Sequence, residues 1–134
     1  MKKKVKSREY WRKKASTLAK KIARMKVGYK CAYCGQGEPF KQTHGSHIYS
    51  EGVYKNMSAD VDNIMCLCAS HHSVVPGRGV SSWNWHAHPG ESWEWFMENY
   101  PELYQTLKKR TQDTMMIVDF EKKYKELKDI FASL

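Results

Sequence analysis

The feature that most constrains this chain is a pair of cysteines, Cys31 and Cys34, that are separated by two residues and followed at once by Gly35. A Cys-x-x-Cys spacing before a glycine is typical of a turn that binds zinc. The chain holds four cysteines, which in a reducing compartment favour metal binding over disulfides. A redox-active pair is the alternative, but the surrounding sequence lacks the strand and helix alternation in which such pairs occur.

The composition predicts one globular domain in the cytoplasm. The 134 residues are 41% hydrophobic, which is enough to build a modest core. No apolar run approaches the roughly 20 residues that cross a bilayer, so we expect no membrane association. The chain starts MKKKVKSREYW, with no apolar stretch behind its charges, so we expect no signal peptide.

Positive charge is concentrated near the N-terminus, where residues 1–30 hold 13 of the 23 Lys and Arg residues and a single acid, Glu9. Apolar residues recur at helical spacing from Ser7 to Met25, which predicts an amphipathic basic helix that Ser7 caps and Gly28 ends. Such a block favours nucleic-acid binding, because Lys and Arg neutralise phosphates and release counterions. A solvated tail that only aids solubility is the alternative. The candidate DNA-binding residues are Lys13, Lys14, Lys20, Lys21 and Arg24.

The remaining sequence predicts an α+β fold that is mostly helical. Short β-prone segments at 47–49 and 63–67 precede a helix that begins near Ala69. Residues 73–90 are rich in Gly and Pro and predict a loop. Two tryptophans of this loop are expected to pack on the core: Trp83 and Trp85.

Helical patterns follow this loop at 91–99, 101–109 and 120–131. We therefore divide a single domain, residues 1–134, into three parts: a basic helix (1–30), a core with its loop (31–90) and C-terminal helices (91–134).

Three motifs follow one another in the middle of the chain: the knuckle of Cys31 and Cys34, the segment 43–48 (Thr-His-Gly-Ser-His-Ile) and the segment 63–72 (Asn-Ile-Met-Cys-Leu-Cys-Ala-Ser-His-His). In this order they resemble the HNH endonucleases of the His-Me finger (ββα-metal) superfamily. The pattern of that family is a zinc knuckle, a histidine on a strand, an asparagine, and a second knuckle on a helix with a final histidine just after it.

Within that superfamily, phage-type and NinG-like proteins are the most similar group, on the segment 44–51 and on Trp85, His86 and Pro89. The resemblance covers about residues 25–100. It implies a zinc-stapled ββα core with helices on either side, in a metal-dependent DNA endonuclease of phage or mobile-element origin that works in the host cytoplasm. It also implies a double-stranded or branched DNA substrate.

The resemblance gives His47 the position of the general base, Asn63 that of the middle asparagine and His72 that of the final, metal-binding histidine. The chemistry of phosphodiester hydrolysis agrees with these roles. A neutral imidazole can take a proton from water, and a divalent cation (Mg²⁺, Mn²⁺ or another) on His72 would stabilise negative charge on the phosphate. Asn63, by hydrogen bonding near His47, would orient the imidazole.

The second zinc knuckle of the resemblance falls on Cys68 and His71. With Cys31 and Cys34 these residues would form a closed Cys₃His zinc site, because Zn²⁺ takes four N or S ligands and a Cys-x-x-His step places two side chains on one helix face. Such a site is structural and couples metal binding to folding. Cys66 is expected to face the core, and would replace Cys68 only if the helix began earlier.

One position departs from the commoner family pattern, since Ser46 precedes the base where Asp or His usually binds the catalytic metal. The ligand shell would then be completed by His44, His86 or His88, or by water and substrate phosphate. We favour His86, because it lies in the segment that the resemblance covers.

A non-catalytic zinc-dependent nucleic-acid-binding module, an inactive family member and an RNA-binding zinc knuckle are the alternatives. A binding module has no use for His47 or for a base-orienting Asn63, which favours the enzyme. The sequence leaves open whether a single chain nicks DNA or a homodimer makes a double-strand break.

Overall fold

The computed structural model describes residues 5–37, 39, 42–72, 83–113 and 116–134. The described part is an α+β fold with a two-stranded antiparallel sheet, which confirms the predicted mostly helical α+β class. Its elements in chain order are α1 (Arg8–Lys26), β1 (Thr43–His47), β2 (Ile64–Cys68), α2 (Ala69–His72), α3 (Pro89–Asn99), α4 (Pro101–Thr111) and α5 (Phe120–Ala132), with 3-10 turns at Lys55–Met57 and Val61–Asn63 between the strands.

The basic helix α1 forms where the sequence predicts it. The hydroxyl of Ser7 caps the helix by accepting a hydrogen bond from the backbone N–H of Tyr10 at 3.1 Å. The chain leaves the helix through Gly28, which has φ +62°. The predicted cap and stop are both confirmed.

The first strand is displaced from its prediction at 47–49. It runs from Thr43 to His47 and pairs with β2 so that Thr43 lies opposite Cys68 and His47 opposite Ile64. The ladder ends near His47 because the backbone N–H of Tyr49 donates to the side-chain oxygen of Asn63 at 2.8 Å. A side chain thus takes a bond that a strand would have used, which the β propensity of the segment could not indicate.

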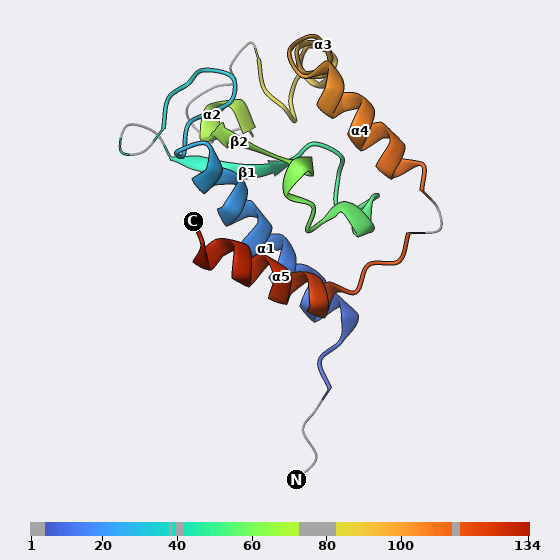
Figure 1. The fold of residues 1–134 in the computed structure, drawn as a ribbon. Helices are drawn as coiled ribbons and strands as arrows, with labels where there is room; N and C mark the ends of the chain where they lie inside the picture. Colours follow the sequence, from blue (N-terminus) through green and yellow to red (C-terminus); the bar gives the residue numbers. More distant parts are fainter. Residues whose placement is uncertain (1–4, 38, 40–41, 73–82, 114–115) are drawn as a thin grey trace.

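Two apolar cores cover the sheet, and all five residues of β2 are buried. Met65 and Leu67 pack into one core with α3 and α4, whereas Ile64 packs into the other with α1 and α5. Figure 1 shows α1 and α5 side by side, with α3 and α4 at the other side of the molecule. Trp83 and Trp85 are buried in the first core, as predicted.

The C-terminal helices α3, α4 and α5 confirm the three helical patterns, and prolines stand at the first turns of α3 and α4, where a missing N–H costs no hydrogen bond. The loop expected at 73–90 lies outside the described residues over 73–82. Arg110 of α4 contacts the carboxylates of Asp60 at 2.7 Å and Asp62 at 3.0 Å, which ties α4 to the turn before β2.

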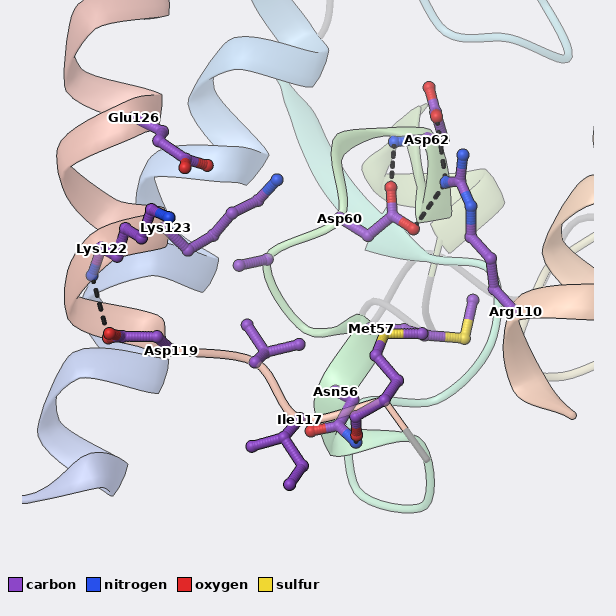
Figure 2. Close-up of a pocket in the computed structure, with 13 residues that line it drawn as sticks. Asn56, Met57, Asp60, Asp62, Arg110, Ile117, Asp119, Lys122, Lys123 and Glu126 are labelled. Atoms are coloured by element: carbon purple, nitrogen blue, oxygen red, sulfur yellow. Dashed lines mark hydrogen bonds and ion pairs between the residues drawn. The ribbon is translucent and has the colours of Figure 1, made fainter. Parts of the chain in front are cut away.

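These three residues border a cavity of about 560 Å³ that extends to the start of α5 (Figure 2). None of the candidate site residues lines this cavity. The candidate site residues lie instead on α1, on the strands, on α2 and in the segments next to them.

Candidate metal centre and histidine cluster

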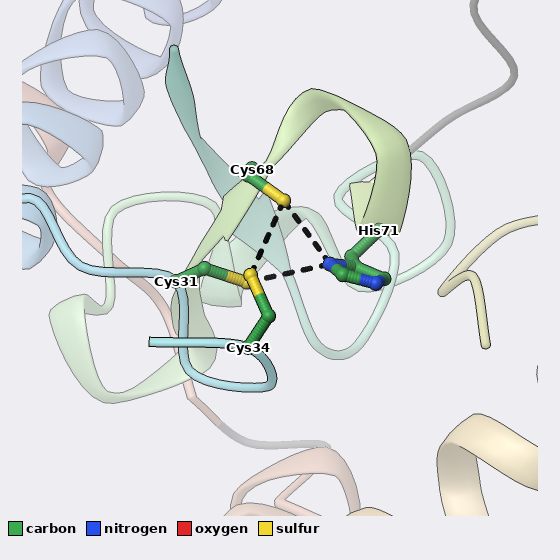
Figure 3. Close-up of side chains that lie close together, drawn as sticks. All are labelled: Cys31, Cys34, Cys68 and His71. Atoms are coloured by element: carbon green, nitrogen blue, oxygen red, sulfur yellow. Dashed lines mark hydrogen bonds between the residues drawn. The ribbon is translucent and has the colours of Figure 1, made fainter. Parts of the chain in front are cut away.

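Four metal-ligand side chains meet where the 31–37 turn lies against the end of β2 and the start of α2 (Figure 3). The Sγ atoms of Cys34 and Cys68 are 3.7 Å apart, and Nδ1 of His71 lies 3.8 Å from Sγ of Cys31 and 3.0 Å from Sγ of Cys68. Two sulfurs of a tetrahedral zinc site, each about 2.3 Å from the ion, lie about 3.8 Å apart. Cys31, Cys34, Cys68 and His71 could therefore hold a zinc ion, as the sequence predicts.

Backbone hydrogen bonds build the turn that carries the first two ligands. The N–H of Cys31 donates to Gln36 O at 2.8 Å, and the N–H of Gly35 donates to Cys31 O at 2.9 Å. Gly35 has φ +75°, which explains the glycine after the second cysteine. The N–H of Ala32 donates to the carbonyl of Cys66 at 2.8 Å, so this turn is attached to β2.

Three of the four cysteines belong to this group, and Cys66 lies outside it. Burial raises the pKa of Cys34 to about 11, so an ion that binds there must displace a proton. Cys66 is buried but lies outside the group of four, which agrees with its expected place in the core.

The imidazole of His47 is held by a backbone carbonyl. Its Nε2 lies 2.8 Å from Ser58 O, and since a carbonyl only accepts, Nε2 carries the proton of the neutral ring. Nδ1 is then the free acceptor, and among the described residues it has no hydrogen-bond partner. The carboxylate of Glu51 lies 3.7 Å from Nε2, on the protonated side of the ring.

Asn63 is fully buried and fixes the segment that follows His47. It accepts from the N–H of Tyr49, donates to the carbonyl of Tyr49 at 3.0 Å and donates to the carbonyl of Met57 at 3.2 Å. Its hydrogen bonds reach the backbone two residues beyond His47, and Ser58 rather than Asn63 contacts the ring. Asn63 therefore positions the loop between the strands.

Three histidines form a cluster near His47: His44, His72 and His86. Nδ1 of His44 lies 3.0 Å from Nδ1 of His72, and the ring centroids of His72 and His86 are 5.0 Å apart. Burial, with a further contribution from the neighbouring His86 and His44, lowers the pKa of His72 to about 4, and burial also lowers the pKa of His44. Both rings are therefore neutral near pH 7, the form that binds metal ions.

His47, His72 and His86 all line one cavity of about 600 Å³, whereas His44 is not among its lining residues. Ser46 does not line it, because its side chain is only 1% exposed; its hydroxyl has no partner within the described chain. His88 is also outside the lining. Of the three histidines considered for the ligand shell, the structure thus brings His44 and His86 to His72.

The candidate DNA-binding residues of α1 fall into two groups. Lys13, Lys14 and Lys21 are exposed, and they border a surface hollow with two tyrosines. Lys20 is half-buried and lines the cavity of His47, and Arg24 lies near the Thr43 hydroxyl, with its Nε 3.4 Å away. The basic face of the helix therefore reaches the edge of the cavity.

Three residues that shape this site have no role among the sequence predictions: Glu51, Ser58 and Asn84. Ser58 acts through its carbonyl, which leaves no sequence signal. Asn84 is fully buried between two core tryptophans; its Nδ2 donates to Ser70 O of α2 at 2.9 Å, and its Oδ1 accepts from His86 N–H at 3.0 Å. A polar residue within a run of core aromatics is the one signal that could have indicated it.

No helix in the described chain has the length and apolar character needed to cross a bilayer. Comparisons with protein-family models, with curated proteins and with solved structures find no match for this chain.

Proposed function

We propose that the protein is a metal-dependent DNA endonuclease of the HNH type, with His47 as general base and a divalent cation at His72 and His86. The observation that carries the proposal is the single cavity that these three side chains line. The order β1, β2 and α2, joined by a group that could hold structural zinc, supports a ββα-metal core. The resemblance of the motifs to HNH endonucleases points to the same activity.

The geometry of His47 suits proton abstraction from water. The Ser58 carbonyl keeps the ring proton on Nε2, which leaves Nδ1 to accept a proton from the attacking water. Glu51 lies 3.7 Å from Nε2 and would stabilise the positive charge that the ring then gains. A cation bound at the histidine cluster would supply Lewis-acid stabilisation of the phosphate and of the departing 3′ oxygen.

The basic face of α1 supports DNA as the substrate. Its exposed lysines lead along the helix to Lys20 at the cavity edge, so phosphates bound on the helix would direct the backbone toward His47. Arg12 has a different role, since it contacts Glu9, Glu51 and the Ser58 hydroxyl and so anchors α1 to the loop that orients the base.

The test is cleavage of supercoiled plasmid, with a branched substrate beside it, by the zinc-loaded protein in the presence of each of several divalent cations. His47→Ala should keep its zinc, fold and DNA affinity but lose a factor of about 10² to 10⁴ in rate, because a positioned base is removed. His88→Ala is the matched control, since His88 lies outside the cavity lining.

Cleavage by His47→Ala at the native rate, while a chelator-treated control is inactive, would refute the general-base assignment. Binding of DNA without cleavage by the native protein under every cation would instead favour the non-catalytic zinc-dependent binding module.

A further inference from the structure

The distances within the histidine cluster indicate which residues could bind the proposed divalent cation, in addition to the zinc of the Cys₃His group. Two nitrogens that bind one ion at about 2.1 Å and at a right angle lie about 3.0 Å apart. The Nδ1 atoms of His44 and His72 have this separation, 3.0 Å. The ring centroids of His86 and His72 are 5.0 Å apart.

The turn that carries His86 is built into the fold. Asn84 accepts from the N–H groups of His86 and Ala87 at 3.0 and 2.9 Å, and it donates to Ser70 O on α2. His86 is therefore held against the helix that carries His72, although its own side chain is exposed. An exposed imidazole that the hydrogen bonds of a buried asparagine position beside a second imidazole is suited to binding a ligand.

Among the described residues, Glu51 is the one carboxylate that lines the cavity of His72 and His86, and it already has other partners. Its Oε2 accepts from the hydroxyl of Ser16 at 3.0 Å and contacts Arg12 at 3.3 Å. Within the described part of the chain, the ligands that the cluster offers are thus imidazole nitrogens. Imidazole suits Zn²⁺, Ni²⁺ and Co²⁺, whereas Mg²⁺ is bound mainly by carboxylate, phosphate and water oxygens.

We propose that His44, in place of the buried Ser46, completes a three-histidine site with His72 and His86, and that this site binds late first-row divalent cations in preference to Mg²⁺. The use of the ion in cleavage rests on the proposed function, but its binding does not. In the absence of a metal, the close approach of His44 and His72 is a hydrogen bond between one protonated and one unprotonated Nδ1.

The test is calorimetric titration of the zinc-loaded protein with Ni²⁺. The native protein should bind one further Ni²⁺, and His44→Ala and His86→Ala should each weaken this binding by at least about ten-fold, because each removes a ligand. His88→Ala should bind like the native protein. Millimolar Mg²⁺ should not displace the ion. His86 is exposed, so His86→Ala should keep the native fold, and zinc content and circular dichroism verify the fold of both variants.

A parallel titration with Co²⁺ identifies the ligands by absorption, since binding at imidazole gives weak visible bands and exchange into the cysteine site gives strong near-ultraviolet bands. Native Ni²⁺ affinity in His44→Ala, displacement by Mg²⁺ at comparable concentration, or no second ion in the native protein would each overturn the proposal. Failure of the proposed function looks different, because Ni²⁺ would bind through the three histidines but no cation would support cleavage.

Discussion

Gly45 of β1 lies in close contact with Lys20 of α1, and Gly45→Ala tests that contact. A Cβ at this position would lie 2.7 Å from Lys20 Cβ and 3.0 Å from Lys20 Cα. Carbon atoms prefer about 3.5–4.0 Å, so the helix and strand would have to separate by roughly 0.5–1 Å. A rotamer change of Lys20 cannot relieve the contact with its Cα.

The expected cost follows from two opposing effects. Overpacking costs about 1–3 kcal/mol, whereas replacing a strand glycine by alanine gains about 0.5–1 kcal/mol of chain entropy. We expect a net loss of about 1–2 kcal/mol, which for a domain of 134 residues lowers Tm by roughly 3–10 °C. Cleavage should also fall, because Lys20 and the cavity edge move away from His47.

Calorimetry of Gly45→Ala and of a matched control, Gly52→Ala, measures the effect. A Cβ at Gly52 would meet its nearest neighbour, the Ser50 hydroxyl oxygen, at an ordinary 3.5 Å, so the control should keep the native Tm. If Gly45→Ala melts at or above the native temperature, α1 does not pack on β1 as described.

Two further predictions concern the zinc group and the basic helix. Elemental analysis should find about one zinc per chain, and Cys34→Ala should lose this zinc and melt at a much lower temperature. Cys66 lies outside the group, so Cys66→Ala should keep the zinc. A metal-free protein that stays folded would contradict the zinc assignment. A variant with four lysines of α1 replaced by Gln should bind DNA with a smaller dependence of log affinity on log salt concentration, the slope falling by about 0.9 for each lost phosphate contact. Replacing Lys108 and Lys109 of α4 by Gln should leave this slope unchanged. An unchanged slope in the α1 variant would show that DNA binds to another surface. The four lysines are Lys13, Lys14, Lys20 and Lys21.

The helices and the group of three cysteines and one histidine that could hold zinc were predictable from the sequence because their signals are local. Caps, helical periodicity and two Cys/His steps each lie within a few residues, and α1 and the Cys₃His group follow them. The position of β1 could not be predicted, because Gly45 lowers strand propensity where close helix packing requires it.

The hydrogen-bond partner of the His47 ring, the Ser58 carbonyl, could not be predicted from the sequence either. This carbonyl is eleven residues away, and the pairing of His44 with His72 spans 28 residues. Ser58 and His72 lie outside the two strands, so these contacts depend on how the loop and α2 pack against β1, which no local pattern specifies.

The loop that orients His47 depends on Asn63, and Asn63→Asp separates this role from zinc binding. The substitution keeps the shape and the acceptor for the Tyr49 N–H, but it removes the amide that donates to the carbonyls of Tyr49 and Met57. Each buried carbonyl left without a donor costs about 1–3 kcal/mol, so the loop should rearrange and release the ring of His47. Zinc should remain, because Cys68 lies at the opposite end of β2.

The same substitution at Asn84 provides the matched control. Asn84→Asp removes the amide that donates to Ser70 O on α2, so it should loosen the turn that carries His86. It should leave the loop that carries Ser58 and orients His47 unchanged. Saturating divalent cation should therefore restore cleavage in Asn84→Asp, since weaker metal binding is overcome by mass action, but not in Asn63→Asp. Plasmid cleavage measured against cation concentration distinguishes the two. Native cleavage by Asn63→Asp at low cation concentration would mean that the loop does not control the base.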